Sequence, residues 1–387
     1  FILRGSQKQL PEDVSEYYVN LLLLLLSIIF YLALANFLNI DITFSKKKKE
    51  DEYQIEEHYH NSVKQEEINA QVAFREADVK KALIVKDVSK TYYSGNSVVK
   101  ALKGVSMCID ENSIFGLLGS NGAGKTTLIS IITQFQKADR GEVMISGEVR
   151  NNGLAGQKVS FCPQYDLLWT VLTIREHLLI FGMLRGYFGS KLTRSVDDLI
   201  ESLDLTTSQH KQVSELSGGM KRRLSLAICL IGDISVVLMD EPTTGLDPRH
   251  RRELWDIIKT HQKGKTFLIS THLMEEAEYL CSRVCILSLG NLKAIGTPNF
   301  LRREFCDYKT LDLVLSRNPE QISEELADRF NCEIIHSFKE LVRMKLPEKF
   351  DKLGELLDIL EKSVPTRLAS WSVKNASLEE VFHKVSC

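Results

Sequence analysis

A stretch of eight residues, Gly119–Thr126, constrains the fold of this 387-residue chain more than any other feature. It reads GSNGAGKT and fits the pattern G-x-x-x-x-G-K-[ST]. The apolar run Ile114–Leu118 precedes it, and the helix-like stretch Leu128–Ile132 follows it. A strand that turns through a glycine-rich loop into a helix is the context in which this pattern binds phosphates. The sequence therefore predicts an α/β domain of the P-loop NTPase class.

The loop offers many donors to a triphosphate. Gly122 and Gly124 let the backbone curl so that its N–H groups face the phosphates. Lys125 would reach the β- and γ-phosphates, and the Thr126 hydroxyl would bind Mg²⁺. A glycine-rich turn without a ligand is the structural alternative, which the strand–helix context disfavours. The expected nucleotide contacts are Gly119, Ser120, Asn121, Gly122, Ala123, Gly124, Lys125, Thr126 and Thr127.

A second motif places two carboxylates after an apolar run. The residues Val236–Met239 predict a buried parallel strand, which Asp240 ends. Ligands of open α/β sheets bind at the carboxyl ends of the strands. Asp240 is therefore a candidate Mg²⁺ ligand, mostly through water, and Glu241 a candidate to polarise an attacking water. An acidic pair at a strand end is common, so this motif gains weight only beside the P-loop.

A third motif, LSGGM, starts a predicted helix at residues 216–220. The Ser217 hydroxyl, the amides of Gly218 and Gly219, and the helix dipole could form a second phosphate cradle. A plain helix cap is the structural alternative, although a cap does not require two consecutive glycines.

The order of the motifs resembles that of an ATP-binding cassette (ABC) nucleotide-binding domain over about residues 83–301. The motifs are the P-loop, FCPQ, LSGGM, VVLMDEP, GLDP and STH. The resemblance implies a cassette with a helical subdomain that hydrolyses ATP. It implies that Gln164 touches Mg²⁺ and the membrane-domain interface, and that His272 contacts the γ-phosphate. It also implies that Asp247 acts across a dimer, and that Tyr92 or its neighbour Tyr93 stacks on adenine.

The expected site follows from the motifs and the resemblance together. Its catalytic residues are Glu241, His272, Lys125 and Gln164. Its Mg²⁺ ligands are Thr126, Gln164 and Asp240. Besides the P-loop residues, its ATP contacts are Tyr92, Ser217, Gly218, Gly219 and Asp247, with the LSGGM and Asp247 contacts made across a head-to-tail pair of cassettes.

The LSGGM form and the closing run SLEEVF resemble the A subfamily of eukaryotic ABC transporters. Met220 departs from the commoner LSGGQ, which puts one amide contact in doubt. In that subfamily the C-terminal element is a small regulatory domain, and many members move lipids. The resemblance thus implies a lipid or another hydrophobic substrate by analogy.

The run Val19–Ile40 contains no charged residue. As a helix it would span roughly 33 Å, enough to cross a bilayer core. The four lysines 46–49 follow it and indicate that its C-terminal side faces the cytosol. A cleaved signal peptide is the alternative, because Ala33-Leu34-Ala35 fits a cleavage site, but the acidic preceding flank and the length of the run disfavour it.

The chain is therefore expected to have five parts. They are an extracytosolic segment 1–18, a transmembrane helix 19–40, a charged cytosolic linker 41–81, the cassette 82–301 and a small α+β domain 307–387. The last part has strand and helix patterns in the order β-α-β-β-α-β, which is ferredoxin-like.

We expect an integral membrane ATPase segment whose cassette and C-terminal domain face the cytosol. One helix cannot line a transport pathway, so partners are implied. These are a second cassette in the same or another chain, the transmembrane helices of the transporter, and membrane lipid. The net charge of −2 does not favour nucleic acid. The alternatives are a soluble ABC ATPase with a role in translation or DNA repair, and a degenerate cassette that only binds nucleotide.

The hydrophobic run and the lysine tract predict the topology. Protease added to sealed vesicles should digest the chain beyond Lys49 only where the cytosolic face is outward, because the cassette would lie on that side. Immunoblotting with an antibody against the C-terminal residues measures this. Protection of the cassette in vesicles with the cytosolic face outward would contradict the predicted orientation.

Overall fold

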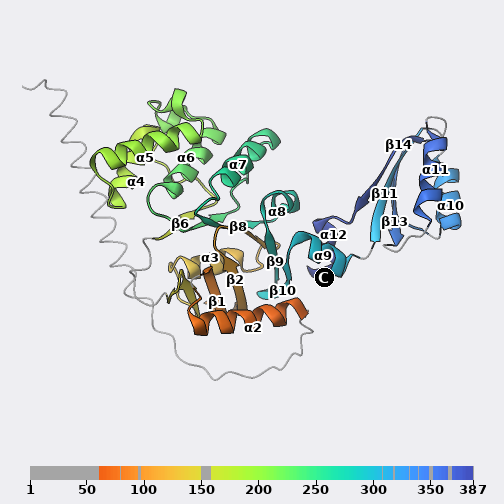
Figure 1. Cartoon of the computed structure of the whole chain (residues 1–387), viewed down its shortest axis with the longest axis horizontal. Helices are drawn as coiled ribbons and strands as arrows, with labels where there is room; N and C mark the ends of the chain where they lie inside the picture. Colours follow the sequence, from red (N-terminus) through yellow and green to blue (C-terminus); the bar gives the residue numbers. More distant parts are fainter. Residues whose placement is uncertain are drawn as a thin grey trace, which may run out of the picture. The chain divides into compact units, whose positions relative to one another are not determined.

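The computed structural model describes residues 61–386, apart from 79, 95–96, 150–157, 307, 317–318, 331, 339, 348–351 and 365–367. These residues form three sheets with helices around them (Figure 1). The predicted membrane helix 19–40 lies outside the described residues. Within the described part, no helix combines the length and the apolar character needed to cross a bilayer.

The central sheet has six strands in the order β10-β9-β3-β8-β7-β6. The pairs β6–β7, β7–β8, β3–β8 and β3–β9 are parallel, and β9–β10 is antiparallel. Strands β3, β7 and β8 are buried along their whole length, because helices cover both faces of a parallel sheet. The bounds are β3 Ile114–Leu118, β6 Val159–Cys162, β7 Val236–Asp240, β8 Thr266–Thr271, β9 Arg283–Ser288 and β10 Asn291–Gly296.

Helices complete this domain. Figure 1 shows α4, α5 and α6 gathered as a separate helical layer beyond β6. The helices are α3 Lys125–Ile132, α4 Ile174–Leu184, α5 Gly189–Ser202, α6 Gly218–Leu230, α7 Pro248–Thr260, α8 Met274–Leu280 and α9 Pro298–Phe305, and single 3₁₀ turns span Thr206–Ser208 and Val213–Glu215. The predicted α/β cassette with a helical subdomain is therefore confirmed in its architecture.

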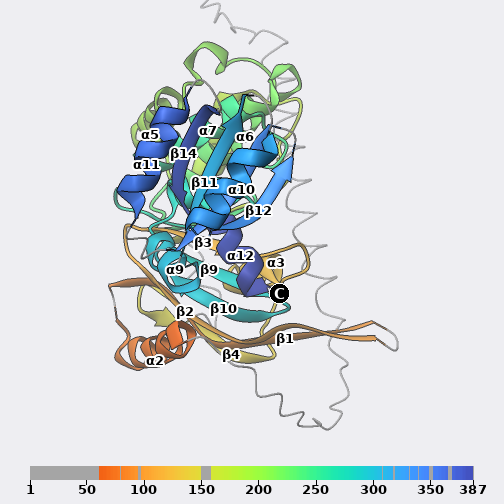
Figure 2. The same cartoon turned by 90° about the vertical axis from the view of Figure 1, so that its right-hand side faces the viewer.

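A second sheet is antiparallel and ordered β2-β1-β4-β5, and it shares a hydrophobic core with the central one. Its strands are β1 Lys81–Ser94, β2 Ser97–Asp110, β4 Arg140–Ile145 and β5 Glu148–Val149. Helix α2, Asn61–Glu76, lies along β1 and β2 (Figures 1 and 2).

Helix α2 lies within the predicted linker 41–81, so the end of that linker is part of the folded domain. Its buried positions are Val63, Glu66, Ala70 and Ala73, which share one helix face. Two of them are alanines and one is a glutamate, so the hydropathy of the sequence does not reveal this stripe. The Glu66 carboxylate accepts from the Cys108 N–H (2.8 Å) and pairs with Arg283 (2.7 Å). This charged contact fixes α2 on the sheet.

The C-terminal region has the predicted order β-α-β-β-α-β. Its antiparallel sheet is ordered β12-β13-β11-β14 and has its own hydrophobic core. The elements are β11 Tyr308–Leu315, α10 Pro319–Phe330, β12 Glu333–Phe338, β13 Leu341–Pro347, α11 Leu353–Ser363 and β14 Leu368–Asn375. The last helix, α12 (Leu378–Ser386), instead buries Leu378 and Val381 in the core of the cassette.

The position of Glu66 yields a prediction. Glu66→Ala should lower the free energy of opening α2 by about 1–3 kcal/mol, because the buried Cys108 N–H would lose its acceptor. Amide hydrogen exchange of residues 61–76 measures this opening. Glu67→Ala is the matched control, since Glu67 is exposed on the same helix. Equal exchange in the two variants would show that Glu66 does not hold α2.

Candidate nucleotide site

The P-loop follows β3 and ends where α3 begins, as predicted. Gly122 and Gly124 have φ angles of 80° and 109°, which favour glycine. A Cβ on Gly124 would lie 2.5 Å from the Ala101 carbonyl oxygen, so a side chain there has no room. The backbone curl expected from the glycines is therefore present.

A cleft of about 930 Å³ opens beside the loop. Eight of the predicted residues line it, which are Asn121, Gly122, Gly124, Lys125, Thr126, Thr127, Gln164 and Glu241. The other wall comes from β2 and the turn after β9, and its residues were not predicted: Val98, Val99, Lys100, Ala101, Lys103 and Leu289. Val98, Val99 and Leu289 are large exposed apolar side chains. They carry no motif, so only their exposure in the fold identifies them.

Tyr92, the expected adenine contact, lies on β1 directly opposite Val99 of β2. Its hydroxyl donates to the Gln136 side chain. The cleft wall, as far as the described residues form it, includes Val99 rather than Tyr92. Tyr92 therefore borders the cleft at the level of the backbone, and its stacking role stays a prediction.

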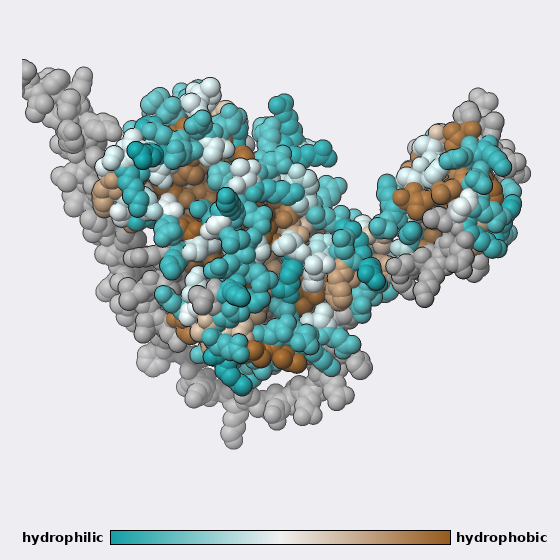
Figure 3. Space-filling view, viewed as in Figure 1, coloured by the Kyte–Doolittle hydropathy of each residue, from teal (hydrophilic) through white to brown (hydrophobic). Residues whose placement is uncertain are grey.

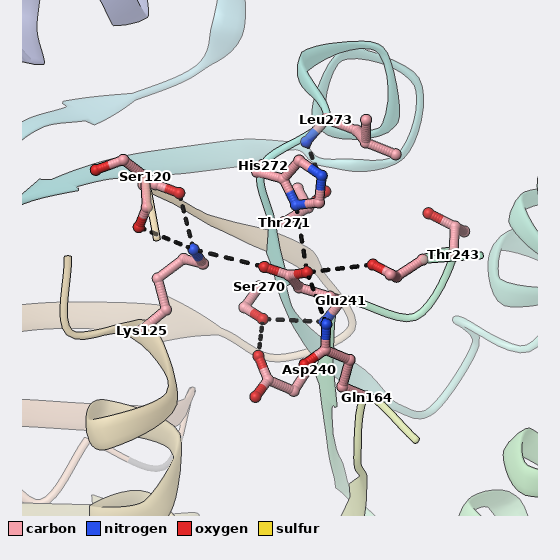
Figure 4. Close-up of polar contacts among 12 residues, drawn as sticks. Ser120, Lys125, Gln164, Asp240, Glu241, Thr243, Ser270, Thr271, His272 and Leu273 are labelled. Atoms are coloured by element: carbon pink, nitrogen blue, oxygen red, sulfur yellow. Dashed lines mark hydrogen bonds and ion pairs between the residues drawn. The ribbon is translucent and has the colours of Figure 1, made fainter. Parts of the chain in front are cut away.

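Glu241 is the meeting point of the predicted catalytic residues (Figure 4). Its carboxylate lies between the Lys125 ammonium and the His272 ring, with Nζ–Oε1 at 3.6 Å and Nδ1–Oε2 at 3.3 Å. The Gln164 amide and the Thr244 hydroxyl each donate to Oε2 at 3.2 Å. Glu241 is only 12% exposed, so these contacts act with little screening by solvent. The structure thus brings together Lys125, Gln164, Glu241 and His272.

Lys125 also bonds to the loop that it belongs to. Its ammonium donates to the carbonyl oxygens of Gly119 (2.8 Å) and Ser120 (3.2 Å). These bonds hold its side chain across the mouth of the loop, where it lines the cleft. The position suits contact with an anionic group bound in the loop.

Asp240 ends β7 beneath the cleft and is buried. It accepts from the Thr126 hydroxyl at 3.0 Å and from the Ser270 hydroxyl. The predicted pair of Mg²⁺ ligands, Thr126 and Asp240, is therefore in direct contact. Both supply oxygen, the donor type that Mg²⁺ prefers.

The LSGGM motif lies elsewhere. Ser217 caps α6 and accepts from the Met220 N–H at 3.3 Å. A Cβ on Gly219 would lie 2.7 Å from Cδ2 of His250, so the motif packs against the turn that starts α7. Among the described residues that line the cleft there is none from this motif.

Asp247 belongs to that same turn. It caps α7 by accepting from the His250 N–H at 2.8 Å, and its carboxylate lies 2.8 Å from the His250 ring Nδ1. Hydrogen bonds from the backbone and the ring of His250 lower the pKa of Asp247. The predicted site residues therefore fall into two groups, one at the cleft and one formed by the signature motif and Asp247.

Residues 102–244 match the family model described as ABC transporter. Two similar curated proteins come from Arabidopsis thaliana. ABC transporter A family member 8 is 38% identical over 79% of this chain and 35% of its own length, and A family member 7 is 36% identical over 80% and 34%. The chain thus spans about a third of the length of the curated relatives it matches.

Two solved structures are similar to the cassette part. One is a dimeric post-hydrolysis state of the ATP-binding cassette MJ0796 bound to ADP and Pi, with 25% identity, a TM-score of 0.51, and coverage of 56% of this chain and 98% of that one. The other is an ATP-binding subunit of an ABC transporter, with 29% identity, a TM-score of 0.51, and coverage of 58% and 93%.

The contacts of Lys125 predict the effect of its removal. Lys125→Ala should lower turnover of nucleoside triphosphate by about 10²- to 10³-fold, because a buried cation at the phosphates would be lost. Lys103→Ala is the control, since Lys103 lines the same cleft but is exposed. Phosphate release measures the turnover of both variants, and a nucleotide-binding assay measures whether each still binds nucleotide. Unchanged turnover in Lys125→Ala would exclude the loop as the phosphate site.

Proposed function

Because this chain contains the nucleotide-binding domain of an ABC transporter of the A subfamily, we propose that it hydrolyses ATP as one segment of a membrane transporter. The observation that carries this proposal is the convergence of Lys125, Gln164 and His272 on the Glu241 carboxylate beside the cleft. Phosphoryl transfer leaves little covalent work to a protein, which must position water and stabilise charge. This group of side chains has the chemistry for both tasks.

In the proposed reaction, Glu241 orients a water molecule and accepts its proton. The water oxygen attacks the γ-phosphorus while the bond from that phosphorus to the bridging oxygen breaks, which yields ADP and inorganic phosphate. Lys125 and His272 stabilise the negative charge on the γ-phosphoryl oxygens. Gln164 holds Glu241 through its amide before and during this step.

Mg²⁺ fits the oxygen donors at the end of β7. Thr126 and Asp240 would hold it, with Gln164 as the third candidate, and the ion would neutralise charge on the phosphates. The direct contact between the Thr126 hydroxyl and the Asp240 carboxylate supports this assignment.

We also propose a head-to-tail pair of cassettes. Ser217, Gly218 and Gly219 lie outside the cleft of their own chain, so a nucleotide contact by the signature motif requires a facing cassette. Asp247 adjoins the same surface. The similar cassette MJ0796, dimeric in its post-hydrolysis state, supports such a pairing.

We further propose that the chain is anchored in a membrane and that its cassette faces the cytosol. The names of the A family relatives and the apolar run Val19–Ile40 support it. Small clusters of apolar residues interrupt the hydrophilic surface over the helical layer (Figure 3). Tyr165 and Leu167, just after Gln164, are 76% and 78% exposed and would suit contact with transmembrane helices.

The C-terminal sheet is proposed to be a ferredoxin-like regulatory domain, and the cargo a lipid or another hydrophobic molecule. The strand order β12-β13-β11-β14 supports the fold assignment. The cargo rests on analogy with the subfamily. A soluble-type ABC ATPase is the second candidate, which the membrane-family relatives disfavour.

Glu241→Gln tests the proposed chemistry. The amide keeps the shape of the side chain but loses its basicity, so turnover should fall by about 10²- to 10⁴-fold. ATP affinity should stay near the parental value, and the ATP-bound chain should accumulate as a pair of cassettes, measured by sizing in the presence of ATP. Glu275→Gln, an exposed carboxylate outside the cleft, is the control. Near-parental turnover would remove Glu241 from the mechanism.

A further inference from the structure

A buried arginine on α6 contacts the segments that carry two of the site residues. Arg222 donates from Nε to the Pro242 carbonyl oxygen at 2.6 Å and from Nη1 to the Pro163 carbonyl oxygen at 2.8 Å. Nη1 also lies 3.1 Å from a carboxylate oxygen of Asp166, which accepts from the Ser225 hydroxyl as well. One guanidinium thus joins α6 to the loop after β6 and the loop after β7.

The two carbonyls flank the contact at the centre of the cleft. Pro242 follows Glu241 in the chain, and Pro163 precedes Gln164. The Gln164 amide donates to the Glu241 carboxylate at 3.2 Å. Arg222 therefore holds the backbone beside both partners of this hydrogen bond, although it is not itself a residue of the cleft wall.

The backbone at Glu241 needs such support. Glu241 has a φ of 44°, a left-handed conformation that costs energy for a residue with a Cβ, and a proline follows it. Its own N–H is held by the Ser270 carbonyl (3.0 Å) and hydroxyl (3.1 Å). The Glu241 carbonyl accepts from the Thr244 N–H at 3.2 Å. Pro242 has no N–H, so its carbonyl is the remaining backbone group of the pair, and Arg222 binds it. Strained conformations of this kind persist only when their surroundings fix them.

The burial of this charged side chain carries a cost as well as a benefit. The Arg222 side chain is 5% exposed, and its buried Nη2 has no hydrogen-bond partner among the described residues. A buried charged donor without a partner destabilises the folded state, whereas an apolar side chain would leave the Pro163 and Pro242 carbonyls without this donor. The planar fork of the guanidinium, however, reaches two carbonyls at once, which an apolar side chain cannot do.

We propose that Arg222 is a positioning residue that ties the signature helix α6 to the hydrolysis site. Through the Pro242 and Pro163 carbonyls it fixes the backbone beside Glu241 and Gln164 to α6. Ser217, five residues earlier in the chain, caps this helix. When Ser217 contacts the nucleotide of a facing cassette, α6 shifts. The Arg222 side chain then transmits this shift to Glu241. The inference rests on the proposed role of Glu241 in ATP hydrolysis.

The test compares two neighbouring arginines of α6 in the full chain. Arg222→Lys keeps the charge but loses the fork, so kcat for ATP should fall about 10- to 100-fold with KM within about twofold. Arg223→Lys is the matched control, because the hydrogen bonds of Arg223 within the described part of the chain go to Leu203 and Asp204 of the helical layer. A fall in kcat that is equal in the two variants, or a matching rise in KM, would overturn the proposal.

A double-mutant cycle separates positioning from general damage. In the Glu241→Gln background, Arg222→Lys should cause no further loss of turnover. The proposed effect of Arg222 passes through Glu241, both directly and by way of the Gln164 amide, and Glu241 has already lost its function. A further loss of the same factor would assign Arg222 a purely structural role. Asp166→Asn gives a second variant, which loosens the Arg222 fork without removing the buried cation, and it should also lower kcat while leaving KM unchanged.

The two proposals fail in different ways. If Glu241→Gln hydrolyses ATP at the parental rate, the proposed role of Glu241 is wrong and the positioning role of Arg222 loses its basis. If Glu241→Gln is inactive but Arg222→Lys equals Arg223→Lys, only the coupling through Arg222 is wrong.

Discussion

The parallel pairing of β3, β8 and β7 aligns Leu118 with Thr271 and Asp240 with Ser270. Because parallel strands end at the same edge of a sheet, the residues that follow these strands reach one place from distant parts of the chain. Lys125, Glu241 and His272 meet there although more than a hundred residues separate the first from the others. If the register of one of these strands slipped by one residue, the side chains of that strand would point to the other face of the sheet.

Charge and strain are balanced at the residue after β7. The Glu241 carboxylate is mostly buried, a position that would be costly without partners, and a lysine, an amide, a hydroxyl and an imidazole surround it. Its backbone adopts a left-handed conformation that β8 and α6 hold from either side. The geometry proposed for water activation therefore depends on packing between the central sheet and the helical layer.

The C-terminal helix α12 contacts the helix that follows His272. The Leu378 N–H donates to the Glu278 carboxylate at 2.7 Å, and Glu278 lies on α8, the helix that begins two residues after His272. His272 and Phe382 of α12 line a common cavity of about 330 Å³. The end of the chain is thus part of the cassette core, whereas the four-stranded sheet before it has a separate core.

Local chemistry in the sequence was enough to predict the P-loop, the strand before Asp240 and the β-α-β-β-α-β order of the C-terminal region. In each case a short pattern carries the information, because glycines, apolar runs and alternation fix backbone preferences over a few residues. The cleft wall formed by Val98, Val99 and Leu289 has no such pattern, and only the assembled sheets expose it.

Tertiary structure alone decided that Glu66 and Arg222 are buried. Both stand among charged neighbours, Glu66 beside Glu67 and Arg222 between Lys221 and Arg223, and such runs predict a solvated face. Whether one member is buried depends on which backbone groups the fold brings to it, here the Cys108 N–H and the carbonyls of Pro163 and Pro242. These partners lie between 20 and 59 residues away along the chain, beyond the range of any local pattern, so packing had to select them.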